Sequence, residues 1–238
     1  MQVDVVLKNS KLLDNRLAGS TVIVIDVLRA TSAIIWAVRN GASQVIPTKE
    51  PGEATDIAGR LGIKDCVLAG ERGGIRISGF QLGNSPLEFT EDVVKNKSVV
   101  ISTTNGTNTI TNVRNASTLL IGAIINRTAV AKKAVESGGD IIIVCSGTDG
   151  NVSADDMCAA GSILAVLKTL LPEDTFYTDS ALVCERLFED HINGTFDIAD
   201  IYHYKRLKKL GFVDDLKFCF ELDKTDVVPY YSNGIIKG

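Results

Sequence analysis

The sequence predicts an α/β protein, in which a largely parallel sheet lies between two layers of helices and a helical section follows near the C-terminus. Two observations lead to this fold class. Short, continuously apolar runs rich in β-branched residues alternate with helix-length segments. Runs of that composition are typical of strands that are covered on both faces. Because strands and helices alternate along the chain, the expected architecture is a three-layer α/β/α sandwich.

The apolar runs set the expected strands at residues 21–28, 44–48, 66–70, 98–103, 118–125 and 140–146. Helices are expected at 30–41, 50–62 and 126–139. Each of these segments ends in glycine, which suits the position just after a helix. A longer helix is expected to begin at Ser153, because Ser153 and Asp156 have the spacing of a capping box.

The remainder of the chain is expected to be mainly helical, with helices at 179–193 and 198–211 and short extended pieces at 218–238. No low-complexity linker interrupts the sequence, so residues 1–238 are interpreted as a single domain. The small apolar face of residues 155–167 fits either the core or a homodimer interface, and the core is the favoured interpretation.

Composition excludes several classes of function. The 238 residues are 45% hydrophobic and 23% charged, with a net charge of −4 and no cluster of lysine and arginine, which does not favour binding to nucleic acid or to a membrane surface. No apolar run approaches the length of a transmembrane helix, and residues 1–13 lack a secretory signal. The five cysteines are widely spaced and odd in number, so we expect neither disulfides nor a zinc site. The expected location of the protein is therefore a reducing cytoplasm.

Polar residues gather where four of the expected strands end. They occupy residues 26–32, 71–74, 103–107 and 146–150, and they include carboxylates, arginines, hydroxyls and glycines. In an open parallel sheet, ligands bind beyond the carboxyl ends of the strands. If the strands are parallel, these groups therefore meet along one edge of the sheet.

These residue types suit a phosphorylated ligand. Glycine lets backbone N–H groups approach an anion, hydroxyls donate hydrogen bonds, and arginine matches phosphate oxygens. Carboxylates among them are ligands for Mg²⁺. The stretch Thr103–Thr107 is accordingly interpreted as an anion cradle at a strand-to-helix turn, although Asn105 and Gly106 are also a common turn pair.

Each strand exit also has a simpler interpretation. Asp26 and Arg29 would suit a structural ion pair, and residues 146–150 would suit an ordinary loop. Glu71 and Arg72 point in opposite directions if the strand continues through them, so one of them would then lie away from a site. The convergence of several such exits is what favours a binding site.

Known phosphate motifs were considered in turn. No P-loop is present, and the sequence around Asp26 lacks the second aspartate of an Asp-x-Asp phosphatase. Cys66 and Arg72 have the spacing of a cysteine phosphatase, but an extended strand would separate them by about 20 Å. His191 is interpreted as a packing residue. His203 precedes several basic residues and suits either a site or a solvated basic helix face.

Six segments occur in an order that resembles one family: "VIDVLRATS" (24–32), "GERGG" (70–74), "GFQLGNSPLE" (79–88), "TTNGT" (103–107), "CSGTDG…SADD" (145–156) and "RLKKLGFVDDLKFCFELDKTDVVP" (206–229). Together they are similar to the 2-phosphosulfolactate phosphatase family (ComB). The resemblance extends through nearly the whole chain. One departure is Asp155, because the family segment often reads Ser-x-Glu-Asp and the acid here is shorter.

The resemblance implies an α/β/α hydrolase that depends on Mg²⁺ and converts (2R)-O-phospho-3-sulfolactate to 3-sulfolactate and inorganic phosphate. In methanogens this step belongs to coenzyme M biosynthesis. The implied catalytic residues are Asp26, Arg29, Glu71, Arg72 and His203, and the implied metal ligands are Asp26, Glu71 and Asp156. The implied substrate-binding residues are Thr31, Ser32, Asn84, Ser85, Thr103, Thr104, Asn105, Gly106, Thr107, Arg127, Ser146 and Gly147.

Two mechanisms are left open by the sequence. Asp26 would attack phosphorus directly, or a metal-activated water would do so, and the missing second aspartate favours water. A carboxylate or His203 would protonate the leaving alkoxide. The alternative functions are a phosphatase of broader small-ester specificity, a module that binds a phosphorylated or sulfonated acid without turnover, and a nucleotide-binding site.

Overall fold

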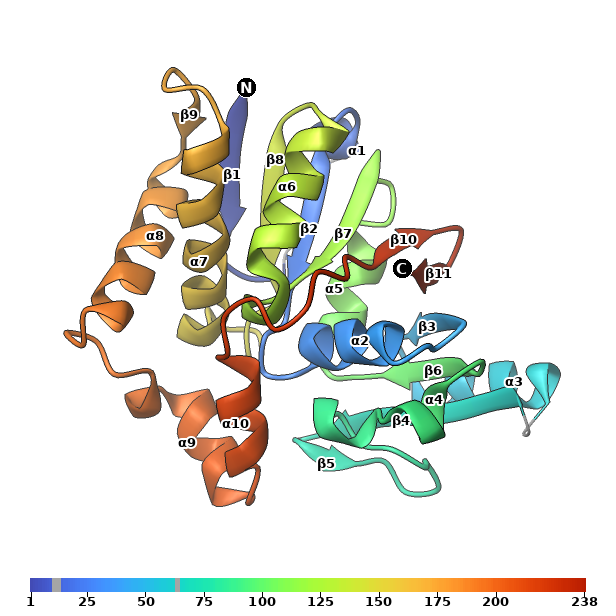
Figure 1. Ribbon diagram of the computed structural model, residues 1–238. Coiled ribbons are helices and arrows are strands. Elements are labelled where there is room, and N and C mark those ends of the chain that lie inside the picture. The colour runs from blue at the N-terminus through green and yellow to red at the C-terminus, as the bar shows by residue number, and fades with distance from the viewer. Residues whose placement is uncertain (10–13, 63–64) are drawn as a thin grey trace.

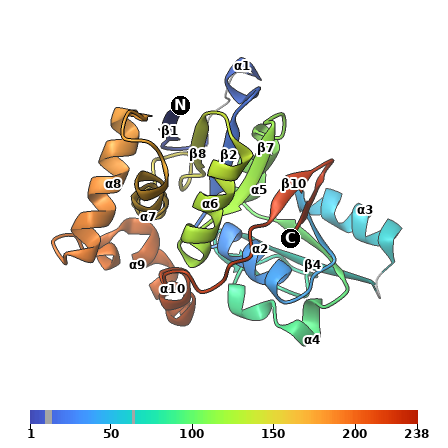
Figure 2. The ribbon, with the colours of Figure 1, turned by 45° about the horizontal axis from the view of Figure 1, so that its top comes forward.

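The computed structural model describes residues 1–9, 14–62 and 65–238, and its strands form one large sheet with helices on both sides (Figures 1 and 2). The strands are β1 (Gln2–Val6), β2 (Thr21–Ile25), β3 (Gln44–Thr48), β4 (Cys66–Arg72), β5 (Ile75–Arg76), β6 (Ser98–Ser102), β7 (Thr118–Gly122), β8 (Ile141–Cys145), β9 (Phe176–Tyr177), β10 (Tyr230–Ser232) and β11 (Ile235–Lys237).

The helices alternate with these strands through most of the chain. They are α1 (Asp14–Leu17), α2 (Ala30–Arg39), α3 (Pro51–Leu61), α4 (Glu91–Val94), α5 (Gly106–Asn112), α6 (Arg127–Ser137), α7 (Ala154–Leu170), α8 (Asp179–Ile192), α9 (Tyr202–Lys209) and α10 (Val213–Cys219), with 3₁₀ turns η2 (Pro86–Glu88), η3 (Ile124–Asn126) and η4 (Ile198–Asp200). The predicted fold class, an α/β/α sandwich with a largely parallel sheet, is confirmed.

The sheet consists of two parallel groups. Its order is β5-β4-β6-β3-β11-β10-β7-β2-β8-β1-β9. Strands β4, β6 and β3 are mutually parallel, as are β7, β2, β8, β1 and β9. The C-terminal hairpin of β10 and β11 lies between the groups and pairs antiparallel with both, through Tyr230 with Leu120 and Ile236 with Val45.

All the expected strands form. Every residue of β2, β6 and β8 is buried, because helices cover both faces of the parallel groups, and this is why their sequences are continuously apolar. Figure 1 shows β2 and β8 running toward the point at which β4 and β6 end. The carboxyl ends of the two groups therefore meet, even though a hairpin separates the groups within the sheet.

The long helix α7 lies in the core. Its residues Cys158 and Ile163 are fully buried, and α7 packs between α6 and α8. This placement confirms the core interpretation of residues 155–167. All five cysteines are free and buried, and burial raises the pKa of the Cys158, Cys184 and Cys219 thiols to about 12. They act as small packing residues, as the sequence predicts.

One local expectation is wrong. Ser153 is the N-cap residue of α7, but its side chain makes no capping hydrogen bond. Its hydroxyl instead bonds to the carboxylate of Asp155, and Asp156 accepts bonds from two other loops. The first turn of α7 thus takes part in tertiary contacts, which override the local capping pattern.

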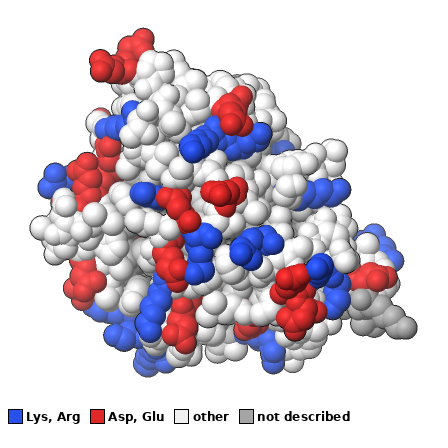
Figure 3. All heavy atoms as spheres, in the orientation of Figure 1, with Lys and Arg blue, Asp and Glu red and all other residues white. Residues whose placement is uncertain are grey.

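Within the described ranges, no helix combines the length and apolarity needed to cross a membrane. On the face shown in Figure 3, basic and acidic side chains are interspersed and separated by uncharged surface. That face therefore presents no extended patch of one charge.

Candidate active site

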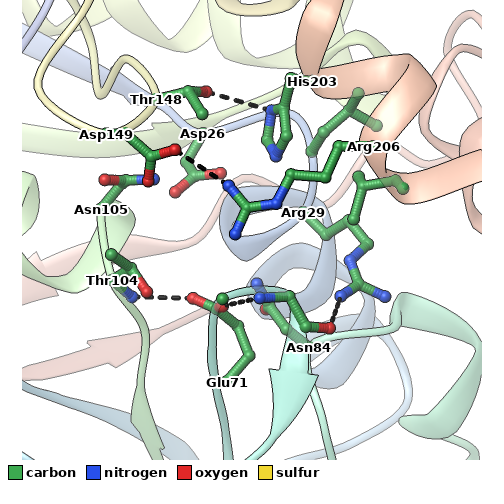
Figure 4. A pocket seen from close by; sticks show the side chains of 14 residues that line it. Asp26, Arg29, Glu71, Asn84, Thr104, Asn105, Thr148, Asp149, His203 and Arg206 are labelled. Atoms are coloured by element: carbon green, nitrogen blue, oxygen red, sulfur yellow. Dashed lines mark hydrogen bonds and ion pairs between the residues drawn. The ribbon is translucent and has the colours of Figure 1, made fainter. Parts of the chain in front are cut away.

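A small pocket opens where β2, β4, β6 and β8 end, and helix α9 covers it from one side (Figure 4). Loops after four strands thus contribute to one site, as the order of polar residues in the sequence predicts. The lining residues are Asp26, Leu28, Arg29, Glu71, Gly73, Gly74, Asn84, Thr104, Asn105, Thr148, Asp149, His203, Arg206 and Leu207.

Asp26 follows β2 directly and is 6% exposed. Its Oδ1 accepts a bond from the Ala30 N–H at 3.4 Å, whereas its Oδ2 accepts none from the described part of the chain. Burial raises the pKa of Asp26 to about 6, with a further increase from Glu71 and opposition from His203. Asp26 is therefore a buried carboxylate with one oxygen left for a ligand.

The stretch Thr103–Thr107 is partly structural. Thr103 and Thr107 each accept a bond from the other's backbone N–H at 3.2 Å, which fixes the turn into α5. Gly106 packs against α2, since a Cβ there would lie 2.6 Å from the Cβ of Ala30. Of this stretch, Thr104 and Asn105 line the pocket. The Thr104 hydroxyl is buried and has no partner among the described residues.

Glu71 and Arg72 lie on opposite faces of β4, because the strand continues through both residues. Glu71 is 7% exposed and faces the pocket, where its two oxygens accept the N–H groups of Thr104 (2.8 Å) and Gly74 (2.6 Å). Arg72 instead donates to the carbonyl of Lys49 and does not line the pocket. Arg72 was expected beside Glu71 in the active site, whereas the structure places its side chain outside the pocket.

Asp156 lies behind the pocket wall. Its oxygens accept the N–H groups of Val27 and Gly147, both at 2.9 Å, and so connect the loops after β2 and β8. Burial raises the pKa of Asp156 well above its ordinary value, and the charges of Asp155 and Asp26 add to this increase. Since Asp156 does not line the pocket, the geometry makes it a link between loops.

Arg29 forms the structural ion pair that the sequence allowed, and it also lines the pocket. Its Nη1 lies 2.6 Å from Asp215 Oδ2, and both side chains are almost fully buried. Nη2 donates to the Gly74 carbonyl at 3.0 Å, and the guanidinium stacks over Phe212. Ser85 donates to the other oxygen of Asp215 and stays outside the pocket lining. The charge of Arg29 is thus already balanced by Asp215.

His203 projects from α9 into the pocket. Its Nδ1 lies 2.9 Å from Asp155 Oδ2 and 3.1 Å from the hydroxyl of Thr148. Because a carboxylate can only accept, Nδ1 carries the hydrogen, and Nε2 faces the pocket (Figure 4). Burial lowers the pKa of His203, but the hydrogen bond and charge of Asp155, with the charge of Asp26, outweigh burial and raise it above the ordinary value.

Of the remaining predicted residues, Asn84 lines the pocket, and its buried Oδ1 has no hydrogen-bond partner within the described ranges. The others lie outside the lining of the pocket. Thr31 and Ser32 bond to backbone atoms of the loop that contains Asp26. Arg127 pairs with Asp223 at 3.0 Å. Those outside the lining are Thr31, Ser32, Arg72, Ser85, Thr103, Gly106, Thr107, Arg127, Ser146, Gly147 and Asp156.

Three further side chains at or beside the pocket were not among the predicted site residues. Asp149 and Arg206 line the pocket and form an ion pair at 2.9 Å, and Asp155 orients His203. The sequence did contain a signal for Arg206, because it lies three residues after His203 and therefore on the same helix face. No sequence pattern joins His203 to Asp155, which belongs to a different helix.

Comparison with known proteins finds similarity along nearly the whole chain. Residues 7–234 match the protein family described as 2-phosphosulpholactate phosphatase. A protein of Caldanaerobacter subterraneus subsp. tengcongensis named "Probable 2-phosphosulfolactate phosphatase" is 40% identical over 94% of this chain and 92% of its own length. Proteins with the same name from Clostridium novyi and Clostridium acetobutylicum are each 38% identical, over 97% and 99% of this chain and 97% and 100% of their own lengths.

Proposed function

Because the chain belongs to the 2-phosphosulfolactate phosphatase family, we propose that it hydrolyses (2R)-O-phospho-3-sulfolactate to 3-sulfolactate and inorganic phosphate. The observation that carries the proposal is the convergence of Asp26 and His203 in one pocket. Asp26 offers a free carboxylate oxygen, and His203 offers Nε2, held in place by Asp155. A binding module would need neither a free carboxylate nor an oriented imidazole.

The charges of the pocket support a requirement for a cation. The carboxylates of Asp26, Glu71 and Asp149 line it together with Arg29, Arg206 and His203, and Arg29 is neutralised by Asp215. A substrate with a phosphate, a sulfonate and a carboxylate brings several further negative charges. A divalent cation would offset these charges at little cost in space, and this favours Mg²⁺ dependence.

The donor atoms present fit Mg²⁺. The described residues hold no group of three or more His, Cys, Asp or Glu side chains suited to a metal, so a cage made only of protein ligands is not expected. Mg²⁺ is commonly held by one or two carboxylates, with water and substrate phosphate completing its shell. Asp26 would hold it here through its free Oδ2, Glu71, whose two oxygens accept backbone N–H groups, would add negative charge beside it, and the unpartnered Asn84 Oδ1 suits its water shell. When bound, Mg²⁺ neutralises charge on the phosphoryl oxygens.

His203 would act as the proton donor. As the P–O bond to the substrate's carbon skeleton breaks, the leaving alkoxide needs a proton, and Nε2 of the protonated imidazole supplies it. The hydrogen bond and charge of Asp155, with the charge of Asp26, raise the pKa of His203 above its ordinary value, and this favours the protonated imidazole. Asp155 then stabilises the ring in the orientation that directs Nε2 into the pocket.

The attacking group would be a water molecule. An aspartate nucleophile of the Asp-x-Asp type needs a second aspartate two residues later, and Leu28 occupies that position. Water then adds to phosphorus as the bond to the alkoxide breaks, and the two protons of that water leave with the inorganic phosphate. Rapid-quench experiments distinguish the two routes, because phosphate trapped covalently on the protein would establish attack by Asp26.

The test is release of inorganic phosphate from synthetic phosphosulfolactate, with and without Mg²⁺, beside simpler phosphate monoesters. We expect Mg²⁺-dependent release that is fastest with phosphosulfolactate and is lost in Asp26→Asn. Asp214→Asn is the matched control, since the Asp214 side chain is 81% exposed and lies outside the pocket. Equal release from all esters would establish a broader phosphatase. Thermal stabilisation by the ligand with no release would establish a binding module instead.

A further inference from the structure

Helix α9 directs His203, Arg206 and Leu207 into the pocket, because residues three and four apart share a helix face. The Nη1 of Arg206 donates to Asp149 Oδ2 at 2.9 Å. The guanidinium also reaches the turn after β4, since a Cβ on Gly73 would lie 3.5 Å from Nη2. Arg206 thus extends from α9 across the pocket, as Figure 4 shows.

Arg206 differs from Arg29 in how firmly its partner is held. Arg29 and Asp215 are both almost fully buried, so that pair is a permanent part of the fold. The side chains of Arg206 and Asp149 are 30% and 50% exposed, respectively. A half-exposed pair of this kind is screened by water and contributes little to stability. Arg206 is therefore the pocket cation that can change partners easily.

Asp149 is held at this place by its backbone. Asp149 and Gly150 have φ angles of +51° and +77°, and Thr148 and Asn151 exchange two backbone hydrogen bonds around them. These are the features of a two-residue turn of type I′, in which Asp-Gly is preferred. Among the described residues, Arg206 is the one hydrogen-bond donor to the Asp149 carboxylate. The carboxylate thus occupies a position at which an anionic ligand could bind Arg206.

We propose that Arg206 binds the carboxylate or sulfonate on the carbon skeleton of the substrate, and that Asp149 occupies this site until the substrate displaces it. This proposal rests on the proposed function. His203 faces the ester oxygen, and side chains three residues apart on a helix start about 5–6 Å from each other. The acid groups of a three-carbon acid lie only two or three bonds from the ester oxygen, so two neighbouring side chains on one helix face can contact both parts of one such molecule. Release from Asp149 frees the planar guanidinium for a two-point contact with the acid.

The test compares Asp149→Asn, Arg206→Gln and the double variant, with phosphosulfolactate and with phenyl phosphate, an ester without acid groups on its skeleton. Asp149→Asn removes the competing charge, so KM for phosphosulfolactate should fall about fivefold. Arg206→Gln should raise it about 10- to 100-fold, and Arg206→Lys should lie between. KM for phenyl phosphate should change much less than KM for phosphosulfolactate in every variant, because phenyl phosphate carries no acid group for Arg206 to bind.

The double variant and a second ion pair provide the controls. In the Arg206→Gln background, Asp149→Asn should have no further effect, because its action depends on Arg206. Lys205 and Asp200 form a pair of the same 2.9 Å length that does not line the pocket. Lys205→Gln and Asp200→Asn should leave KM unchanged.

Calorimetric binding of 3-sulfolactate separates this proposal from the proposed function, because it needs no turnover. Tighter binding by Asp149→Asn and weaker binding by Arg206→Gln would support the exchange even if the protein hydrolysed no ester. The proposal is overturned if Asp149→Asn weakens binding or leaves it unchanged. Equal loss for both esters in Arg206→Gln would overturn it too, since a general displacement of α9 would explain that result.

Discussion

Asp155→Asn tests the proton-donor role of His203 most directly. Asp155 is 1% exposed, and its Oδ2 lies 2.9 Å from His203 Nδ1. Asparagine is nearly the same size, so the substitution removes the negative charge without leaving a cavity. The variant therefore separates the electrostatic role of Asp155 from its packing.

The expected size of the effect follows from that contact. A hydrogen bond to a charged group contributes about 1.5–3 kcal/mol, and about 1.4 kcal/mol corresponds to a tenfold change in rate. Since Asp155 stabilises the protonated imidazole, kcat/KM for phosphosulfolactate should fall about 10- to 100-fold at neutral pH.

The pH dependence of kcat/KM should also change in a defined direction in Asp155→Asn. Asp155 raises the pKa of His203, and a proton donor loses activity as the pH rises through its pKa. Removing the charge of Asp155 lowers that pKa. The falling alkaline limb of kcat/KM should therefore lie at lower pH in Asp155→Asn than in the wild type.

The assay is phosphate release across the pH range, with 4-nitrophenyl phosphate as a second substrate. Its leaving group is a weak base and needs little protonation, so its hydrolysis should be nearly unaffected in Asp155→Asn. Asp200→Asn serves as the control, because Asp200 is exposed and, among the residues that the structure describes, its carboxylate pairs with Lys205 alone. An unshifted alkaline limb, or equal losses for both substrates, would refute the role assigned to the Asp155–His203 pair.

Three further predictions concern the shape and charge of the site. Gly106→Ala should destabilise the protein by about 1–3 kcal/mol in urea unfolding, because the new methyl would lie 2.6 Å from the Cβ of Ala30; an unchanged midpoint would contradict this packing. Asp215→Ala should cost about 3–5 kcal/mol by leaving the buried Arg29 unpaired, whereas Asp214→Ala on the exposed side of α10 should change stability little. Mg²⁺ should raise the melting temperature of chelator-treated protein, since ligands of the native state stabilise it, and Ca²⁺ at the same concentration should do so less.

The strands that are predicted well from the sequence are those whose burial requires a continuous run of apolar residues. β2, β6 and β8 are covered on both faces and are continuously apolar, so their composition alone indicates them. β1 escaped prediction because Asp4 interrupts a short run. Short extended pieces were expected at 218–238 and β10 and β11 lie there, but the hairpin joins the parallel groups through only one residue pair on each side, and so few pairs leave no pattern that indicates its place in the sheet.

The same distinction applies to the site. Strand exits are local, and Asp26, Glu71 and Thr104 were predicted at the pocket and do line it. Contacts between distant segments are not local. Asp155 and His203 are 48 residues apart in sequence, and neither has a neighbouring pattern that indicates the other. Their pairing is evident only in the folded structure, in which His203 of α9 lies beside the first turn of α7.

The structure also divides the predicted carboxylates into two kinds. Asp156 connects the loops after β2 and β8, because each of its oxygens accepts a backbone N–H. Glu71 connects the β4 turn to the loop after β6 in the same way. Arg29 joins the β2 loop to the β4 turn through the carbonyl of Gly74. All four loops are thus held together by side chains that bond to backbone.

This network of hydrogen bonds explains why residues that were predicted to be catalytic or metal-binding also maintain the shape of the pocket. A carboxylate whose oxygens both accept backbone N–H groups cannot be replaced without freeing two loops, so loss of activity in Asp156→Ala or Glu71→Ala would not by itself identify a catalytic group. Asp26 differs, because its Oδ2 accepts no bond from the described residues. Asp26→Asn should therefore keep the melting temperature of the wild type while losing activity, and this separation of stability from activity is what distinguishes a reacting carboxylate from one that only builds the site.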